Sequence, residues 1–122
     1  MFAFNPLLNT DYLNEIYGND LTIVQIIFES FLDDNIPIWE EILGKINSKN
    51  YKQVSDMTHQ IKPSFSMVGL TYLHPKIQEF EIFTKENPDE NELLVKYNNL
   101  TVEINQAKTI IKDELNRLNQ LI

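Results

Sequence analysis

Apolar residues recur every three or four positions along most of the chain, the spacing of helices that bury one face. After Asn19 and Asp20, which could cap a helix, two apolar groups follow: Val24, Ile27, Phe28, Phe31 and Leu32, then Ile38, Trp39, Ile42, Leu43 and Ile46. This pattern predicts one long helix, or two halves joined at a bend. Pro37 lacks a backbone donor and crowds the carbonyl four residues back, so we expect a kink that need not end the helix.

Four further helices follow from the same spacing. A short one is predicted from about Thr10 to Tyr17, closed by Gly18, a third from Tyr51 to Val68 and a fourth from Pro75 to Lys85. The last helix is the most regular, with an apolar stripe made of Leu93, Tyr97, Leu100, Ile104, Ala107, Ile111, Leu115, Leu118 and Ile122. The sequence Asn-Pro-Asp at 87–89 separates it from the fourth helix.

Nothing in the sequence signals strands, because the alternation and the turn dipeptides of hairpins are missing and only three glycines occur. We therefore expect an all-α protein. Short connections favour antiparallel neighbours, which predicts an up-down-up-down antiparallel four-helix bundle with an additional short N-terminal helix. The 122 residues are enough for one small domain, so residues 1–122 are expected to form a single domain and a monomer.

Composition narrows the function. The chain has 18 acidic and 10 basic residues, a net charge of -8, which argues against binding nucleic acid. It has no cysteine for disulfides or thiolate metal sites, and its first residues lack the features of a secretory signal. No apolar stretch is long enough for a membrane span, so we expect a cytoplasmic protein without membrane contact. Residues 1–44 hold eight acids and no Lys or Arg, which indicates a solvated face or a surface that steers a basic partner.

The third helix carries the most informative residues. Its apolar positions lie on one face, and His59 lies about 160° from Ile61 at the helical angle of about 100° per residue, so His59 is predicted to face solvent. Lys62 and Ser66 follow three and seven positions later, which predicts that they share this exposed face. Pro63 lies four residues after His59 and must press on its carbonyl, so we expect a local distortion there.

An exposed imidazole beside a lysine suits phosphoryl chemistry. A neutral imidazole nitrogen attacks phosphorus well near neutral pH, where amines are protonated. The ammonium of Lys62 would stabilise the charge of the phosphoryl group during transfer and afterwards.

The run from His59 to Gly69 resembles the signature of histidine-containing phosphotransfer (HPt) domains, in which Lys follows the His at +3 and Gly follows at +10. The resemblance extends to Glu81 at +22, where members commonly carry Glu or Gln, and to the acidic stretch from Phe31 to Pro37. It covers nearly the whole chain. Pro63 stands where the family more often has Gly.

This resemblance implies a phosphorelay intermediate in two-component signalling. His59 would accept a phosphoryl group from a receiver-domain aspartyl-phosphate or a hybrid sensor histidine kinase and pass it to an Asp of a response-regulator receiver domain. Lys62 would stabilise the phosphoryl group, Glu81 would orient the imidazole, and Pro63 and Gly69 would be structural. The family implies no intrinsic cofactor, since Mg²⁺ comes from the receiver. No ATP-binding motif is present, so we expect a carrier and not an enzyme with kinase activity.

Other interpretations remain open at this point. The chain could be a phosphate-free helical adaptor that binds a receiver domain or kinase, or, more remotely, a metal-dependent hydrolase using His59, His74 and carboxylates. We expect His74 to cap a helix or lie in a loop, and Asp56 to be a solvated surface acid or an acceptor for the His59 ring. Phe65 fits a core position better than a docking surface.

Overall fold

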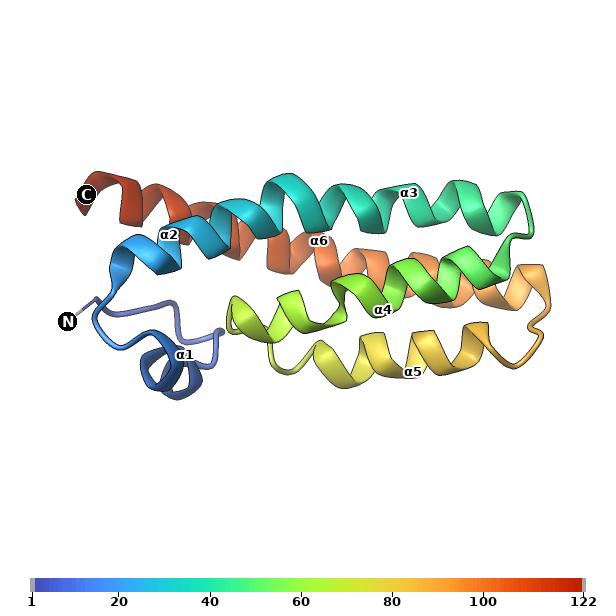
Figure 1. The fold of residues 1–122 in the computed structure, drawn as a ribbon, viewed down its shortest axis with the longest axis horizontal. Helices are drawn as coiled ribbons and strands as arrows, with labels where there is room; N and C mark the ends of the chain where they lie inside the picture. The colour runs from blue at the N-terminus through green and yellow to red at the C-terminus, as the bar shows by residue number, and fades with distance from the viewer. Residues whose placement is uncertain (1, 122) are drawn as a thin grey trace.

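The computed structural model describes residues 2–121 and shows only helices there, which confirms the all-α prediction (Figure 1). Its elements are α1 (Thr10–Tyr17), α2 (Leu21–Ser30), the π-helical turn η1 (Phe31–Asn35), α3 (Ile36–Asn47), α4 (Tyr51–Met67), α5 (His74–Thr84) and α6 (Glu90–Leu121). Each predicted helix is present, with bounds that differ from the prediction by a few residues at most. The predicted stripe residue Ile122 lies outside the described residues.

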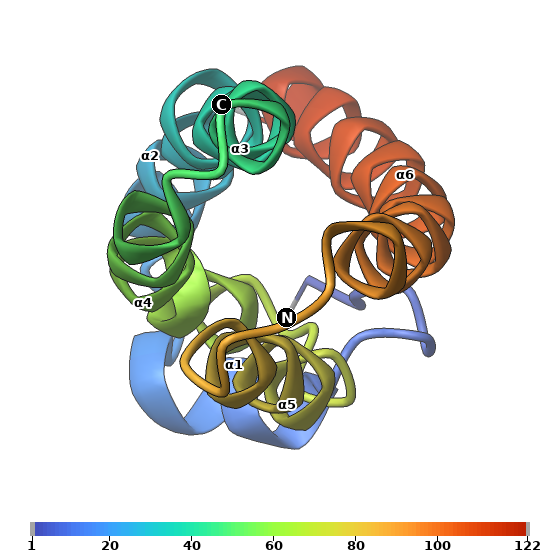
Figure 2. The same ribbon diagram turned by 90° about the vertical axis from the view of Figure 1, so that its right-hand side faces the viewer.

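The long helices lie along one another. In Figure 1 the chain runs through α2, η1 and α3, turns back into α4, and turns again into α5 and α6. Figure 2, seen along the long axis, shows these helices around a common interior, and Figure 1 shows α1 at one end of the molecule. Within residues 2–121 no helix is both long enough and apolar enough to cross a membrane.

The interior is filled by the apolar faces that the spacing predicts. Trp39 of α3 stacks on Tyr97 of α6 at 4.6 Å between ring centroids. The Tyr97 hydroxyl donates to the Trp39 carbonyl at 2.6 Å, and the Trp39 indole donates to Thr101 at 3.0 Å. Burial raises the pKa of Tyr97 to about 12, so its hydroxyl keeps its proton and remains a donor. These contacts fix α3 against α6.

The predicted stripe of α6 differs from the structure at one point. Glu114 is buried, with 3% of its surface exposed, whereas its neighbour Leu115 is only partly buried. The carboxylate of Glu114 is accommodated because Arg117 and the backbone of Asn5 both donate to it.

Pro37 distorts the long helix as predicted, and the distortion takes the form of a π-helical turn. The Ile36 N–H donates to the Phe31 carbonyl five residues back, and α3 then begins with Pro37 in its first turn. A wider turn tolerates a proline that cannot donate and that crowds the preceding turn. The helix continues, in agreement with the prediction.

Gly69 ends α4 in a way that only glycine allows easily. Its φ is +84°, its N–H donates to the Ser66 carbonyl, and the Leu70 N–H donates to the Phe65 carbonyl, which is the Schellman pattern. A Cβ added to Gly69 would lie 2.8 Å from Leu13 Cδ1 of α1. The turn therefore closes α4 and brings α1 against its end.

Candidate functional site

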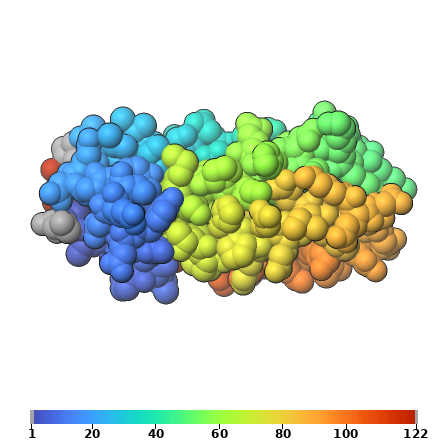
Figure 3. Space-filling view, turned by 60° about the horizontal axis from the view of Figure 1, so that its bottom comes forward, coloured from blue at the N-terminus to red at the C-terminus, as the bar shows by residue number. Residues whose placement is uncertain are grey.

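His59 lies on the outer face of α4, next to α5. Figure 3 shows α4 in green beside α5 in yellow on one open face of the molecule. The His59 side chain is 71% exposed, in agreement with the outward direction predicted from the helical pattern. A partner could therefore reach the imidazole without any rearrangement of the helices.

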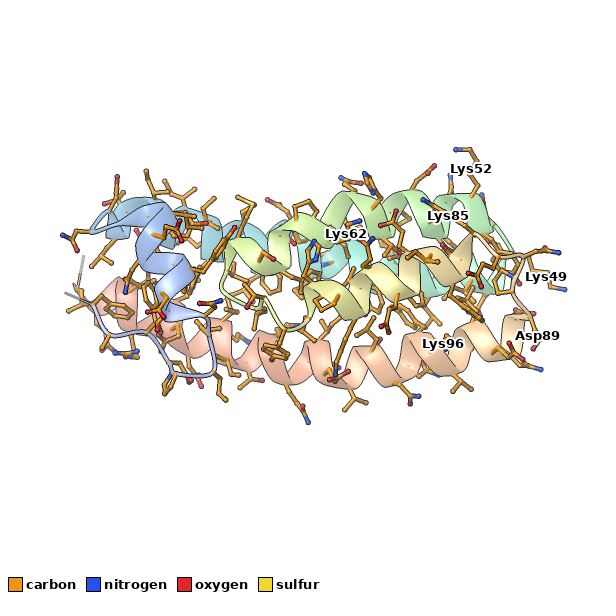
Figure 4. The ribbon with its side chains drawn as sticks, turned by 90° about the horizontal axis from the view of Figure 1, so that it is seen from below. Lys49, Lys52, Lys62, Lys85, Asp89 and Lys96 are labelled. Carbon is orange, nitrogen blue, oxygen red and sulfur yellow. The ribbon has the colours of Figure 1, made fainter. Side chains whose placement is uncertain are left out.

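Three polar side chains contact a single carboxylate, that of Glu81 on α5. Its Oε2 lies 3.0 Å from His59 Nδ1 and 3.2 Å from Lys85 Nζ, and its Oε1 lies 2.9 Å from Lys62 Nζ. The Glu81 side chain is only 7% exposed. We call His59, Lys62, Glu81 and Lys85 the Glu81 cluster; Figure 4 labels its two lysines, Lys62 on α4 and Lys85 at the end of α5.

The charge of Glu81 fixes the arrangement of protons on the ring. Burial alone would raise the pKa of Glu81, but hydrogen bonds from Lys62, Lys85 and His59 outweigh it and hold the pKa below its usual value. The carboxylate is ionised near neutral pH and can only accept, so His59 Nδ1 must be the donor. The neutral ring then carries its free lone pair on Nε2, the nitrogen that does not contact Glu81.

The Lys62 side chain is not exposed, although the sequence predicts that it lies on the exposed face of the helix. Its side chain is only 14% exposed, because the ammonium turns inward to donate to Glu81 and, at 2.8 Å, to Gln78 of α5. The angular position of a residue on a helix fixes where its Cα lies. The long lysine side chain can still bend toward an acceptor on the neighbouring helix, as Lys62 does here.

Two residues of the site, Lys85 and Gln78, were not predicted from the sequence. Lys85 follows Glu81 by four positions, a spacing that pairs Glu with Lys on a helix and could have indicated the contact. Gln78 carries no such signal, because its contact with Lys62 joins two helices.

The other residues singled out in the sequence lie apart from the cluster. Asp56 pairs with Lys52 at 3.0 Å on the solvent side, in agreement with the expectation of a surface acid. His74 begins α5, and no side-chain capping bond forms at that helix start. Phe65 is buried in the core, as predicted. Among residues 2–121, no group of three or more His, Asp or Glu side chains could hold a metal ion.

Pro63 lies within α4, and the helix continues through it. Together with Met67 of α4 it lines a groove whose other wall includes Ile27 and Phe31. The groove is lined by α4 and by the segment from α2 to η1, and His59 is not part of its lining. It combines apolar walls with the polar side chains Ser30, Asn35, Gln60 and Ser64.

Comparison with protein-family models, with curated proteins and with solved structures found no match for this chain.

Proposed function

We propose that this protein is a phosphorelay intermediate of the HPt type, which accepts a phosphoryl group on His59 and passes it to an aspartate of a receiver domain. One observation carries the proposal: an exposed imidazole whose Nδ1 is held by a buried, ionised carboxylate and whose Nε2 is free. The resemblance of residues 59–69 to the HPt signature supports the same proposal.

The transfer step follows from this arrangement. The Nε2 lone pair of His59 attacks the phosphorus of an aspartyl-phosphate, the bond from phosphorus to the aspartyl oxygen breaks, and the carboxylate leaves with the electron pair. The ring keeps its Nδ1 proton and gains positive charge. Glu81 faces that charge at 3.0 Å, as a carboxylate does behind the histidine of a catalytic triad.

The same geometry favours the reverse step. A phosphorylated ring that keeps its Nδ1 proton is a better leaving group than one that has lost it, so Glu81 supports transfer in both directions. This reversibility is what a relay intermediate needs. The receiver domain would supply the Mg²⁺ and the aspartate, while this chain supplies the nucleophile and its counter-charge.

The architecture fits this role. We take α2–α3, α4, α5 and α6 as the up-down-up-down four-helix bundle and α1 as its additional N-terminal helix (Figure 2). In such a bundle the nucleophile sits on a rigid helix. The second helix of the bundle, α4, presents His59, and the third, α5, presents Glu81.

The test is to incubate the purified protein with a phosphorylated receiver domain and to follow its intact mass. We expect a gain of one phosphoryl group that is lost in acid, maps to His59 and is absent from His59→Gln. Binding of a receiver without any gain in mass would instead favour the phosphate-free adaptor. In that case the groove lined by Ile27, Phe31, Pro63 and Met67 would be the first surface to mutate.

A further inference from the structure

Lys62 and Lys85 hold opposite oxygens of the same carboxylate. Lys62 contacts Oε1 of Glu81, and Lys85 contacts Oε2, the oxygen that also accepts from His59. The two lysines differ in exposure: the Lys62 side chain is 14% exposed and the Lys85 side chain 61%. The structure thus gives one buried carboxylate two ammonium partners.

The role proposed for Lys62 creates an electrostatic problem at Glu81. If its ammonium turns toward a phosphoryl group on Nε2, it must leave Oε1 of Glu81. A buried carboxylate that loses its only cation is strongly destabilised, because it has neither water nor a counter-charge. A second cation that stays in place removes this obstacle.

Lys85 is placed to be that second cation. It follows Glu81 by four residues, the favourable order for a Glu–Lys pair on a helix, and it lies at the C-terminal end of α5, where the helix dipole favours positive charge. Its contact with Oε2 does not depend on Lys62. Lys85 can therefore remain on the carboxylate while Lys62 moves.

We propose that Lys85 is a positioning residue that keeps Glu81 paired while Lys62 moves from Glu81 to the phosphoryl group on His59. The inference deepens the proposed function and rests on it. The movement also leaves Glu81 with fewer competing donors at the moment when the ring of His59 gains positive charge. Lys85 acts through Glu81 and does not touch the phosphoryl group.

The experiment uses phosphoramidate as a small donor and the intact mass of the full chain as the readout. Attack by Nε2 of His59 on the donor protonated at nitrogen breaks its phosphorus–nitrogen bond, and the nitrogen leaves with the electron pair as ammonia. Rates are compared for wild type, Lys62→Gln, Lys85→Gln and the double variant. Lys85→Arg tests whether a cation that cannot lose its charge restores the rate.

We expect Lys85→Gln to react about tenfold more slowly than wild type, because Lys62 is then the last lysine on the buried Glu81 carboxylate and is held back from the phosphoryl group. In the Lys62→Gln background the same change should cost more than about tenfold, because it leaves the buried Glu81 carboxylate without any lysine partner. Lys85→Arg should match wild type. The control is Lys52→Gln, which removes an exposed α4 lysine that pairs with Asp56 and has no contact with Glu81.

A wild-type rate in Lys85→Gln, an equal loss in both backgrounds, or no rescue by arginine would overturn the inference. If a variant does not fold, wild type alone decides through NMR of the lysine Nζ groups. On phosphorylation, the Lys62 signal should shift strongly and the Lys85 signal little; an unchanged Lys62 signal would overturn it. If the rates with phosphoramidate are as expected but the protein accepts no phosphoryl group from any receiver domain, the result contradicts the proposed function. It leaves the role inferred for Lys85 unchanged.

Discussion

Two glutamates are buried among residues 2–121, and different kinds of groups balance the charge of each carboxylate. Glu81 on α5 is paired by side chains alone: His59, Lys62 and Lys85. Glu114 on α6 accepts from Arg117 at 2.6 Å and from the backbone N–H of Asn5 at 3.0 Å. The first carboxylate lies at the open face of α4 and α5, and the second lies under the N-terminal segment.

The two sites differ in whether the groups that contact the carboxylate can turn away from it. The N–H of Asn5 belongs to the main chain, and Arg117 is also tied to the Ala3 carbonyl and stacks over the Phe2 ring. Glu114 therefore clamps the N-terminal segment to the end of α6. The partners of Glu81 are long or exposed side chains that can turn to a new ligand. A buried charge with mobile partners suits chemistry, and one with fixed partners suits stability.

The largest predicted effect is on the rate of phosphoryl transfer, and of the two glutamates only Glu81 should show it when substituted. Glu81→Ala removes both the acceptor and the negative charge behind the imidazole, so phosphoryl transfer from a receiver domain should fall about a hundredfold. Glu81→Gln keeps an acceptor for the Nδ1 proton but no charge and should fall between Glu81→Ala and wild type. Stopped-flow or quenched-flow transfer assays provide the measurement.

Glu114→Ala is the matched control for that assay. It removes the other buried carboxylate and leaves the Glu81 cluster intact, so its transfer rate should equal that of wild type. A comparable loss of rate in Glu81→Ala and Glu114→Ala would mean that both act through the fold, and the distinction between them would fail.

A smaller effect is predicted for the free energy of unfolding when Glu114 is substituted. Glu114→Gln removes the charge that Arg117 and Asn5 share, and we expect it to lower the free energy of unfolding by about 2 kcal/mol, a value reduced for the half-exposed Arg117. Urea denaturation followed by circular dichroism measures this loss. An unchanged midpoint would show that the N-terminal segment is held by its apolar contacts alone.

Much of the fold was predictable because helical periodicity reports burial directly. The buried face of α4 and the outward direction of His59 both followed from an angle of about 100° per residue. The short helix Thr10–Tyr17 and its closing Gly18 followed from local signals. Local chemistry and long-range packing agree at these positions, so the sequence alone was sufficient.

The rest depended on contacts between helices that no single-helix pattern contains. The inward turn of Lys62 requires Gln78 and Glu81 on α5, and the burial of Glu114 requires Asn5 and Arg117. The π-helical turn before Pro37 was expected only as a kink, because a proline predicts that a helix is disturbed but not how. Side-chain reach and tertiary pairing decided these points.

The smallest predicted effect is on how the free energy of unfolding changes with pH in the acid range. The cluster holds the pKa of Glu81 below its usual value, so the carboxylate adds stability that is complete above the unfolded pKa and is lost as the pH falls through the folded pKa. Glu81→Gln cannot titrate. The difference in unfolding free energy between wild type and Glu81→Gln should therefore shrink as the pH is lowered below about 4.5. The other acids titrate alike in both proteins and cancel from that difference. Urea denaturation at a series of pH values measures it, and a difference that stays constant across this range would mean that Glu81 is not held as an ion by its partners.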